Sequence, residues 1–202
     1  MIYIIAKAIL YVFCKIYFRL EVKGADNVPK KGGVLVASNH SSLLDPVIVG
    51  VGISRQTYFL TKQNLFEIPI FGLLIRVLHT IPVRREQVSV STLKELIKSL
   101  NAKKAIILFP EGTRSVDGKL GQGKIGIGML ALKAAVPIVP VYIDGAIKAF
   151  PKDEKWIQPK KIRVVFGKPI MPNSKDTNKN NYRRISAQVM ESINRLKENI
   201  AC

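Results

Sequence analysis

The chain has 202 residues, of which 48% are hydrophobic, and it carries a formal net charge of +18 at pH 7. This length suits one domain with a sizeable core, the apolar content excludes a disordered chain, and the charge favours an anionic partner such as nucleic acid, an anionic membrane surface or a phosphorylated substrate. With two cysteines and two histidines, the composition argues against a disulfide framework or a metal site and fits a reducing compartment.

The first 18 residues are almost continuously apolar. They lack the cleavage site of a signal peptide, and the run is short for a membrane-spanning helix, which needs about 20 apolar residues. On a helix, Lys7, Tyr11, Lys15 and Arg19 would fall in one sector about 120° wide, with apolar residues elsewhere. This pattern favours a helix lying in a membrane interface with its cations at the headgroups. The alternative is a helix docked on the protein's own core.

The rest of the chain alternates between strand-like and helix-like patterns. Strands are predicted near residues 18–23 and at 34–38, 57–61, 79–85, 105–109, 137–143 and 161–166. Helices are predicted at residues 46–51, 62–76, 89–100, 126–134 and 181–200. Pro82 disfavours a central position for its strand, and the alternation in 161–166 suggests an edge strand. The whole pattern predicts an α/β fold with a mixed, largely parallel sheet flanked by helices on both faces.

The first candidate motif runs from Asn39 to Asp45 and follows the predicted strand at 34–38. A histidine at the end of a buried strand faces the crevice where α/β sheets usually bind ligands. Asp45 precedes Pro46 and is expected at the start of the next helix. A turn would bring its carboxylate to one nitrogen of His40, which fixes the tautomer and leaves the other nitrogen as a base. Taken alone, the stretch also fits a structural turn histidine and an ordinary helix cap.

The second motif, Phe-Pro-Glu-Gly-Thr-Arg-Ser at residues 109–115, follows the apolar run at 105–109 and leads into a glycine-rich loop. The glycine spacing matches neither a Walker loop nor a dinucleotide fingerprint, so we interpret the loop as one that passes close to a substrate. Because both motifs follow buried strands, they should open on the same edge of the sheet. No Cys or Lys adjoins His40 as a nucleophile. His40 is therefore expected to activate a hydroxyl group of the substrate.

Together, Asn-His-x-x-x-x-Asp and Phe-Pro-Glu-Gly-Thr-Arg-Ser resemble the motifs of the glycerolipid acyltransferase family, specifically its bacterial 1-acylglycerol-3-phosphate acyltransferases. The similarity extends from about Leu20 to Phe166 and includes a proline-containing motif at residues 136–141. Residues 79–85 resemble the family's second motif, with a departure. The family usually has Gly where His79 stands, and Asp or Asn where Arg84 stands. This departure concerns the acceptor site.

The resemblance implies transfer of an acyl chain from acyl-CoA or acyl carrier protein to the sn-2 hydroxyl of lysophosphatidic acid, without a cofactor or metal. The product is phosphatidic acid, used in phospholipid biosynthesis. His40 would be the general base, and Asp45 would orient it. The residues implied in substrate binding are Asn39, Lys62, Arg85, Glu111, Gly112, Thr113 and Arg114. Within this set, the resemblance assigns the acceptor phosphate to the basic residues, shaping of its pocket to Glu111 and Thr113, and fixing of the first loop to Asn39.

These inferences predict an N-terminal membrane-interface helix at residues 1–19 and an acyltransferase domain at 20–202. The protein is expected on the cytoplasmic face of the cell membrane, as a peripheral or monotopic protein bound to an anionic surface. An acyltransferase for glycerol 3-phosphate or another lysolipid stays open as an alternative, as does a basic lipid- or nucleic-acid-binding protein without catalysis. Nucleic acid is not a predicted partner, because the basic residues are scattered and no nucleic-acid-binding motif occurs.

Overall fold

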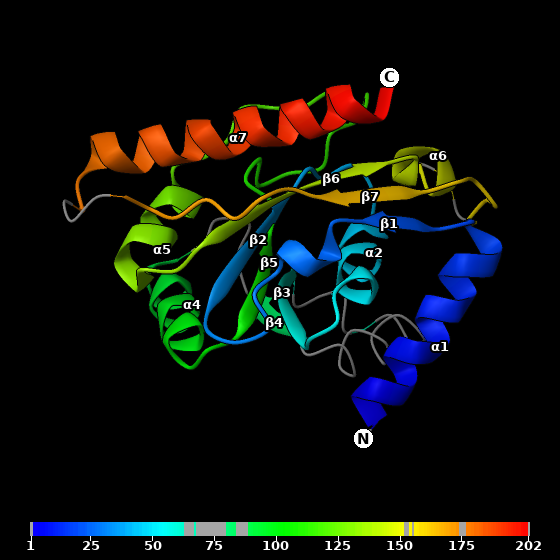
Figure 1. Ribbon diagram of the computed structural model, residues 1–202, viewed down its shortest axis with the longest axis horizontal. Coiled ribbons are helices and arrows are strands. Elements are labelled where there is room, and N and C mark those ends of the chain that lie inside the picture. The colour runs from blue at the N-terminus through cyan, green and yellow to red at the C-terminus, as the bar shows by residue number, and fades with distance from the viewer. Residues whose placement is uncertain are drawn as a thin grey trace.

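The computed structural model describes residues 2–62, 67, 80–83, 89–151, 154, 156–173 and 177–201. In this part of the chain, seven strands form one sheet in the order β1-β7-β6-β2-β5-β3-β4 (Figure 1). The strands are β1 (Glu21–Lys23), β2 (Val34–Ser38), β3 (Thr57–Lys62), β4 (Thr80–Val83), β5 (Ala105–Leu108), β6 (Ile138–Asp144) and β7 (Arg163–Phe166). All neighbouring strands are parallel except β6 and β7, which confirms the predicted mixed, largely parallel sheet.

Helices cover both faces of the sheet, as predicted (Figure 1). They are α1 (Ile2–Tyr17), the 3-10 helix η1 (Ala25–Asn27), α2 (Asp45–Gly52), α4 (Val90–Asn101), α5 (Gly126–Ala134), α6 (Ala146–Ala149) and α7 (Lys179–Ala201). Alternate residues of β2 enter two cores. Val34 and Val36 pack with α1 and α2, whereas Leu35 and Ala37 pack with α4, α5 and α7. The central strand β2 is therefore buried on both sides, and its carboxyl end is held rigidly.

Two predictions about sheet edges have different outcomes. β4 is the last strand on its side of the sheet, which confirms the peripheral position that Pro82 indicated. The edge position predicted for residues 161–166 is wrong, because β1 pairs with β7 on its outer side through Glu21 and Arg163. The alternation in β7 arises because only one of its faces is fully buried, not because a ladder of hydrogen bonds is missing. The helix predicted at 62–76 lies largely outside the described residues.

Helix α1 packs against α2 with a side that includes Lys7, Leu10 and Cys14, and it turns a largely apolar side outward. The Lys7 ammonium donates hydrogen bonds to the carbonyl oxygens of Ile53 and, at 2.9 Å, of Arg55. Ile53 caps the carboxyl end of α2, where carbonyl groups lack helical partners, so Lys7 supplies a donor there. The outward position predicted for Lys7 is therefore wrong. The apolar residues of α1 that are at least half exposed are Ile2, Ile4, Ile5, Ile9, Val12 and Ile16.

Among the described residues, no helix has the length and apolar character needed to cross a membrane. Helix α1 has 16 residues, and burial of Cys14 on its inner side raises the pKa of that thiol to about 11. The helix is thus both docked on the protein through one side and open on the other. The alternative of a docked helix therefore describes the inner side of α1, and contact of its outer side with a membrane stays a prediction.

Docking of α1 should depend on pH through Lys7. Burial lowers the pKa of Lys7 from 10.5 to about 8. Between these values the unfolded chain binds more protons than the folded protein, so folded stability rises with pH across this range. We expect the unfolding free energy of the wild type, measured relative to that of Lys7→Met, to increase between about pH 8 and pH 10.5. Below pH 8 the difference between the two proteins should stay constant. Denaturant titrations of both proteins measure this difference, and a difference that stays flat throughout would contradict it.

Candidate active site

The predicted contact between His40 and Asp45 is present at the carboxyl end of β2. The distance from His40 Nδ1 to Asp45 Oδ2 is 2.9 Å. The side chain of Asp45 is fully buried and that of His40 is 18% exposed. Because a carboxylate only accepts hydrogen bonds, it selects the tautomer with the proton on Nδ1. The Nε2 lone pair of His40 is then free to take a proton.

The Asp45 carboxylate also organises the loop that carries His40. Asp45 is the first residue of α2, after the capping residue Leu44. Its Oδ2 accepts hydrogen bonds from the backbone N–H groups of Ser41 at 2.6 Å and Ser42 at 2.7 Å. In the described part of the chain, the buried Oδ1 has no hydrogen-bond partner. Three donors therefore converge on one oxygen atom, and this oxygen fixes both the imidazole and the loop backbone.

The second motif contacts the first directly, because β5 lies beside β2 in parallel register. Glu111 is 7% exposed, and its Oε1 accepts a hydrogen bond of 3.0 Å from the backbone N–H of His40. The other oxygen of Glu111 accepts from the N–H of Gly121 at 2.8 Å. The N–H of Ser115 donates to the carbonyl oxygen of His40 at 2.7 Å. The expectation that both motifs share one edge of the sheet is confirmed, and Glu111 joins His40 to the glycine-rich loop.

Two further side chains hold the first motif in place. The Asn39 amide donates to the carbonyl oxygen of Ile143 at 3.0 Å and accepts from its N–H at 2.8 Å, which ties the end of β2 to β6. The Ser42 hydroxyl donates to the carbonyl oxygen of Phe150 at 3.1 Å. These bonds give Asn39 the loop-fixing role expected of it, while a substrate contact by Asn39 stays a prediction. The bond to Phe150 also gives the buried Ser42 hydroxyl a structural partner.

The aromatic ring of Phe109 lies against the imidazole of His40. The ring centroids are 3.9 Å apart and the planes differ by 18°. Sequence reasoning did not find this contact, because an apolar residue at the end of a buried strand is usually a core residue. Only the position of Phe109, directly before Pro-Glu-Gly-Thr-Arg, signals a function.

Cationic side chains border the second motif. Gly112 has a φ of +74°, a backbone conformation that favours glycine, and the end of the Lys124 side chain lies close to it. The N–H of Lys124 also donates to the carbonyl oxygen of Pro110 at 2.8 Å. Arg114 is half-buried, and Thr113 is exposed. Among the described residues, neither Arg114 nor Lys124 forms a salt bridge, so both cations are available to an anion.

The remaining residues predicted to bind substrate are not placed. Lys62 ends β3, which neighbours β5 in the sheet, but its side chain lies outside the described residues. Arg85 also lies outside them, as do His79 and Arg84. Their assignment to the acceptor phosphate stays a prediction.

Replacing Glu111 by glutamine should destabilise the protein, because one carboxylate oxygen that accepts a backbone N–H becomes a donor. Hydrogen bonds to charged groups are worth about 1.5–3 kcal/mol, and we expect Glu111→Gln to lower the unfolding free energy by about this amount. Denaturant titration measures the loss. The matched control is Glu95→Gln, at an exposed position of α4, for which we expect the unfolding free energy to change by no more than about 0.5 kcal/mol. Equal values for the two variants would mean that the Glu111 bonds contribute nothing.

Comparisons with known proteins show which family the chain resembles. Residues 19–144 match the family model described as Acyltransferase. The chain is 30% identical over 172 residues to a 1-acyl-sn-glycerol-3-phosphate acyltransferase of Bacillus subtilis, covering 80% of this chain and 82% of the relative. It is 31% identical over 179 residues to the chloroplastic 1-acyl-sn-glycerol-3-phosphate acyltransferase LPAT1 of Arabidopsis thaliana. That match covers 87% of this chain but only 50% of the plant protein, so the chain spans about half the length of this relative.

A solved structure is similar over nearly the whole chain. It is the 1-acyl-sn-glycerophosphate acyltransferase PlsC of Thermotoga maritima, with a TM-score of 0.76 and 30% sequence identity. The match covers 95% of this chain and 79% of the other. The matched region holds both motifs and the strands that position them. The chain belongs to the acyltransferase family.

Proposed function

We propose that the protein is a 1-acylglycerol-3-phosphate O-acyltransferase. It transfers an acyl chain from acyl-CoA or acyl carrier protein to the sn-2 hydroxyl of lysophosphatidic acid and produces phosphatidic acid. The observation that carries the proposal is the His40–Asp45 pair, whose contact of 2.9 Å leaves His40 Nε2 available. No hydroxyl or thiol in the described part of the chain hydrogen-bonds to Nε2, which supports a hydroxyl supplied by the substrate. The names of the relatives and of the Thermotoga structure support the choice of acceptor.

In this mechanism His40 acts first as a base and then as an acid. Nε2 takes the proton of the acceptor hydroxyl while its oxygen attacks the thioester carbonyl. The new C–O bond forms, the C–S bond breaks, and the imidazolium returns the proton to the leaving thiolate. Asp45 keeps the imidazole in the required tautomer and stabilises its cationic form. Glu111 holds the backbone of His40 throughout, so the loop that carries the imidazole keeps its position beside the two substrates.

The acceptor phosphate would lie beside the second motif. Arg114 supplies a planar fork of donors that matches a phosphate, and Lys124 supplies a compact ammonium next to Gly112. Lys62 and Arg85 complete this cationic pocket in our proposal. Gly112 and Thr113 allow the phosphate to approach the backbone of the loop. Lys124 adds a candidate that was visible in the sequence only as part of the glycine-rich segment.

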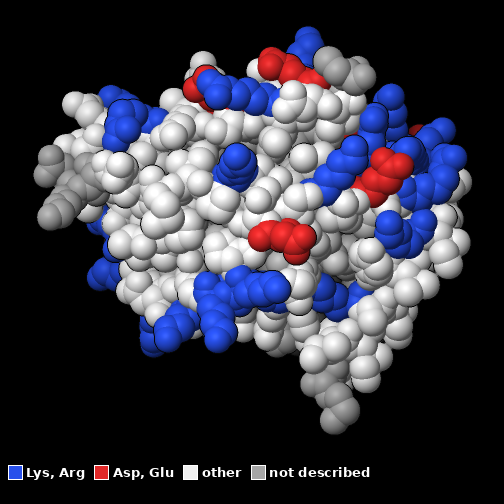
Figure 2. All heavy atoms as spheres, viewed as in Figure 1, with Lys and Arg blue, Asp and Glu red and all other residues white. Residues whose placement is uncertain are grey.

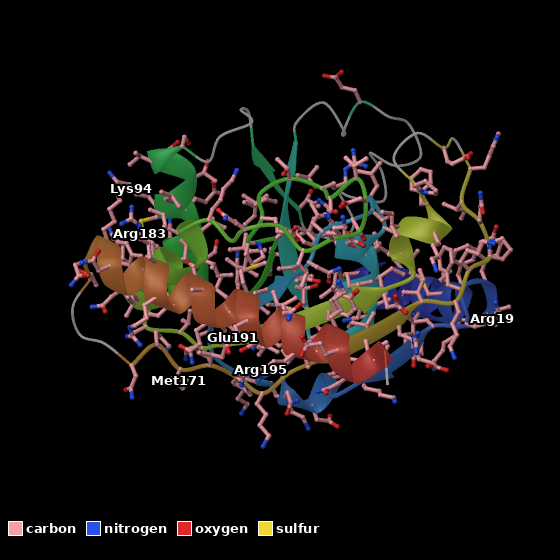
Figure 3. The ribbon with its side chains drawn as sticks, turned by 90° about the horizontal axis from the view of Figure 1, so that it is seen from above. Arg19, Lys94, Met171, Arg183, Glu191 and Arg195 are labelled. Carbon is pink, nitrogen blue, oxygen red and sulfur yellow. The ribbon has the colours of Figure 1, made fainter. Side chains whose placement is uncertain are left out.

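The outward side of α1 is the proposed membrane contact. Its exposed isoleucines form a continuous apolar surface on a helix that is otherwise docked on α2. Basic residues are spread widely over the rest of the molecule. Figure 2 shows several groups of Lys and Arg on one face, and Figure 3 places Arg19 and Arg183 at opposite ends. Anionic lipids attract about 1 kcal/mol per suitably placed cation, so a few of these suffice to support binding at the cytoplasmic face.

Membrane binding should weaken when the outward side of α1 acquires a charge. Ile9 is 64% exposed, and burying such a side chain in the acyl region contributes about 1.5–3 kcal/mol. We expect Ile9→Asp to lower binding to phosphatidylglycerol-containing vesicles by about tenfold or more in a flotation assay. Val90→Asp is the matched control, since Val90 is 70% exposed on α4, across the sheet. Equal losses in both variants would show that general charge, and not α1, governs binding.

The test of the proposed reaction is an acyl-transfer assay on membranes. It offers lysophosphatidic acid, glycerol 3-phosphate and a neutral lysolipid as acceptors, each with acyl-CoA and with acyl carrier protein as donor. Transfer to lysophosphatidic acid above the other acceptors supports the proposal. Preferred transfer to glycerol 3-phosphate or the neutral lysolipid would retain the mechanism and change the substrate. No transfer to any acceptor with either donor would overturn the proposed activity.

A further inference from the structure

We propose that Phe109 is a positioning residue that fixes the plane of the His40 imidazole. The two rings are stacked, with centroids 3.9 Å apart and planes that differ by 18°. The inference rests on the proposed function, in which Nε2 of His40 moves the proton. It assigns to an apolar side chain the task of holding the base in the orientation that the reaction needs.

The hydrogen bonds of His40 restrict the tilt of its ring only in part. Glu111 and Ser115 hold its backbone N–H and carbonyl groups. Asp45 holds the imidazole at one atom, Nδ1. The torsion about the bond to an aromatic ring has a broad energy minimum and a hydrogen bond tolerates bending, so one bond at Nδ1 restricts the tilt of the ring without fixing it. Nδ1 and Nε2 are separated by one carbon of the same rigid ring, so a tilt that bends the hydrogen bond at Nδ1 also turns the lone pair of Nε2 out of position. A parallel ring at van der Waals distance removes this freedom on one side.

Phe109 is itself held in place, so its ring offers a fixed surface against which the imidazole packs. It directly follows β5, which lies between β2 and β3 in the sheet. Its side chain is partly buried and packs against the core on the α2 side. Its carbonyl oxygen accepts a hydrogen bond of 3.0 Å from Gly112, which closes the turn of the second motif. The phenyl ring has no polar atom that competes for the proton, and its π face favours the cation formed when His40 is protonated.

The experiment compares Phe109→Leu with Phe109→Tyr, which retains the aromatic ring. We expect Phe109→Leu to lower kcat about tenfold or more with KM for both substrates unchanged, because displacing a reacting group by 1 Å costs on the order of 10²-fold. Phe109→Tyr should restore most of the rate. A kcat that is unchanged in Phe109→Leu, a rise in KM alone, or equal losses in Leu and Tyr variants would each overturn the proposal.

An NMR measurement reads the stacking without any substrate. The chain has two histidines, so a His79→Gln variant assigns the His40 ring signals in histidine-labelled protein. The Phe109 ring current should shift the His40 ring protons upfield in the wild type and in Phe109→Tyr, and this shift should be lost in Phe109→Leu. Phe166→Leu is the matched control, since Phe166 is a buried phenylalanine of β7 and the change should leave the His40 signals in place.

The two measurements separate the failure of this inference from that of the proposed function. Unmoved His40 signals in Phe109→Leu would overturn the stacking, whatever acceptor the enzyme uses. An upfield shift that disappears in Phe109→Leu supports the stacking even when lysophosphatidic acid is not the acceptor. In that case kcat is compared with the acceptor that the wild type does use.

Discussion

His40→Ala should lower kcat by about 10²–10⁴-fold, the usual contribution of a general base, while the fold is retained. The buried carboxylate of Asp45 holds Nδ1 of the His40 imidazole, and Nε2 is the nitrogen that would take the proton. Its removal leaves the acceptor hydroxyl without a group that takes its proton. The acyl-transfer assay with lysophosphatidic acid measures the effect, and far-UV circular dichroism of the variant checks the fold.

Ser41→Ala is the matched control for this experiment. Ser41 adjoins His40, and its backbone N–H, not its hydroxyl, forms the hydrogen bond to Asp45. Alanine retains that N–H, so we expect kcat to stay within a few-fold of the wild type. A large loss in Ser41→Ala would indicate a serine nucleophile in place of the substrate hydroxyl. Activity that survives in His40→Ala would remove His40 as the base.

Asp45→Asn should lower kcat by about 10²–10⁴-fold with little change in KM, because the amide lacks the charge that stabilises protonated His40. Asparagine still offers one oxygen to the N–H groups of Ser41 and Ser42, so the loop should keep its shape. Asp45→Ala removes the acceptor of three hydrogen bonds and should also destabilise the protein, since each buried donor without a partner costs about 1–3 kcal/mol. Steady-state kinetics and denaturant titration separate the two effects.

Asp144→Asn provides the control at the same end of the sheet. Asp144 ends β6 and forms a surface salt bridge of 2.8 Å with Arg163, with a side chain that is 37% exposed. Exposed ion pairs contribute about 0–1 kcal/mol, so we expect almost no change in stability and none in kcat. If Asp45→Asn behaved like this control, the carboxylate would have no part in catalysis.

Much of the fold was predictable because the buried strands appear in the sequence as short apolar runs bounded by turn-forming residues. Residues 34–38 and 105–108 are examples, and they form the central pair β2 and β5. Strand order was harder, because it depends on which runs pair in space. A strand was predicted near residues 18–23, but its pairing with β7 was not, and this pairing makes the predicted edge wrong. The orientation of α1 followed from a carbonyl group at the end of α2, which periodicity within α1 cannot reveal.

The candidate site was predictable where chemistry requires a particular residue type. The His40–Asp45 contact followed from a base that needs an orienting acid at the end of a strand. The hydrogen bond between Glu111 and the backbone N–H of His40 was not predictable, because the sequence does not distinguish a carboxylate that binds an N–H group from one that lines a pocket. Stacking of Phe109 was hidden for a similar reason, since phenylalanine after a buried strand usually joins the core.

The hydrogen bonds that hold the first motif join distant parts of the chain. The order in which these parts are synthesised therefore decides when the site can form. His40 is held by a residue 71 positions later, Asn39 by one 104 positions later and Ser42 by one 108 positions later. A nascent chain that has just completed α2 therefore contains both His40 and Asp45 but none of these partners. Such long-range contacts raise the contact order and form late in folding. The proposed base and its acid are translated early, and the loop that carries them is held in place only after β5, β6 and α6 have left the ribosome.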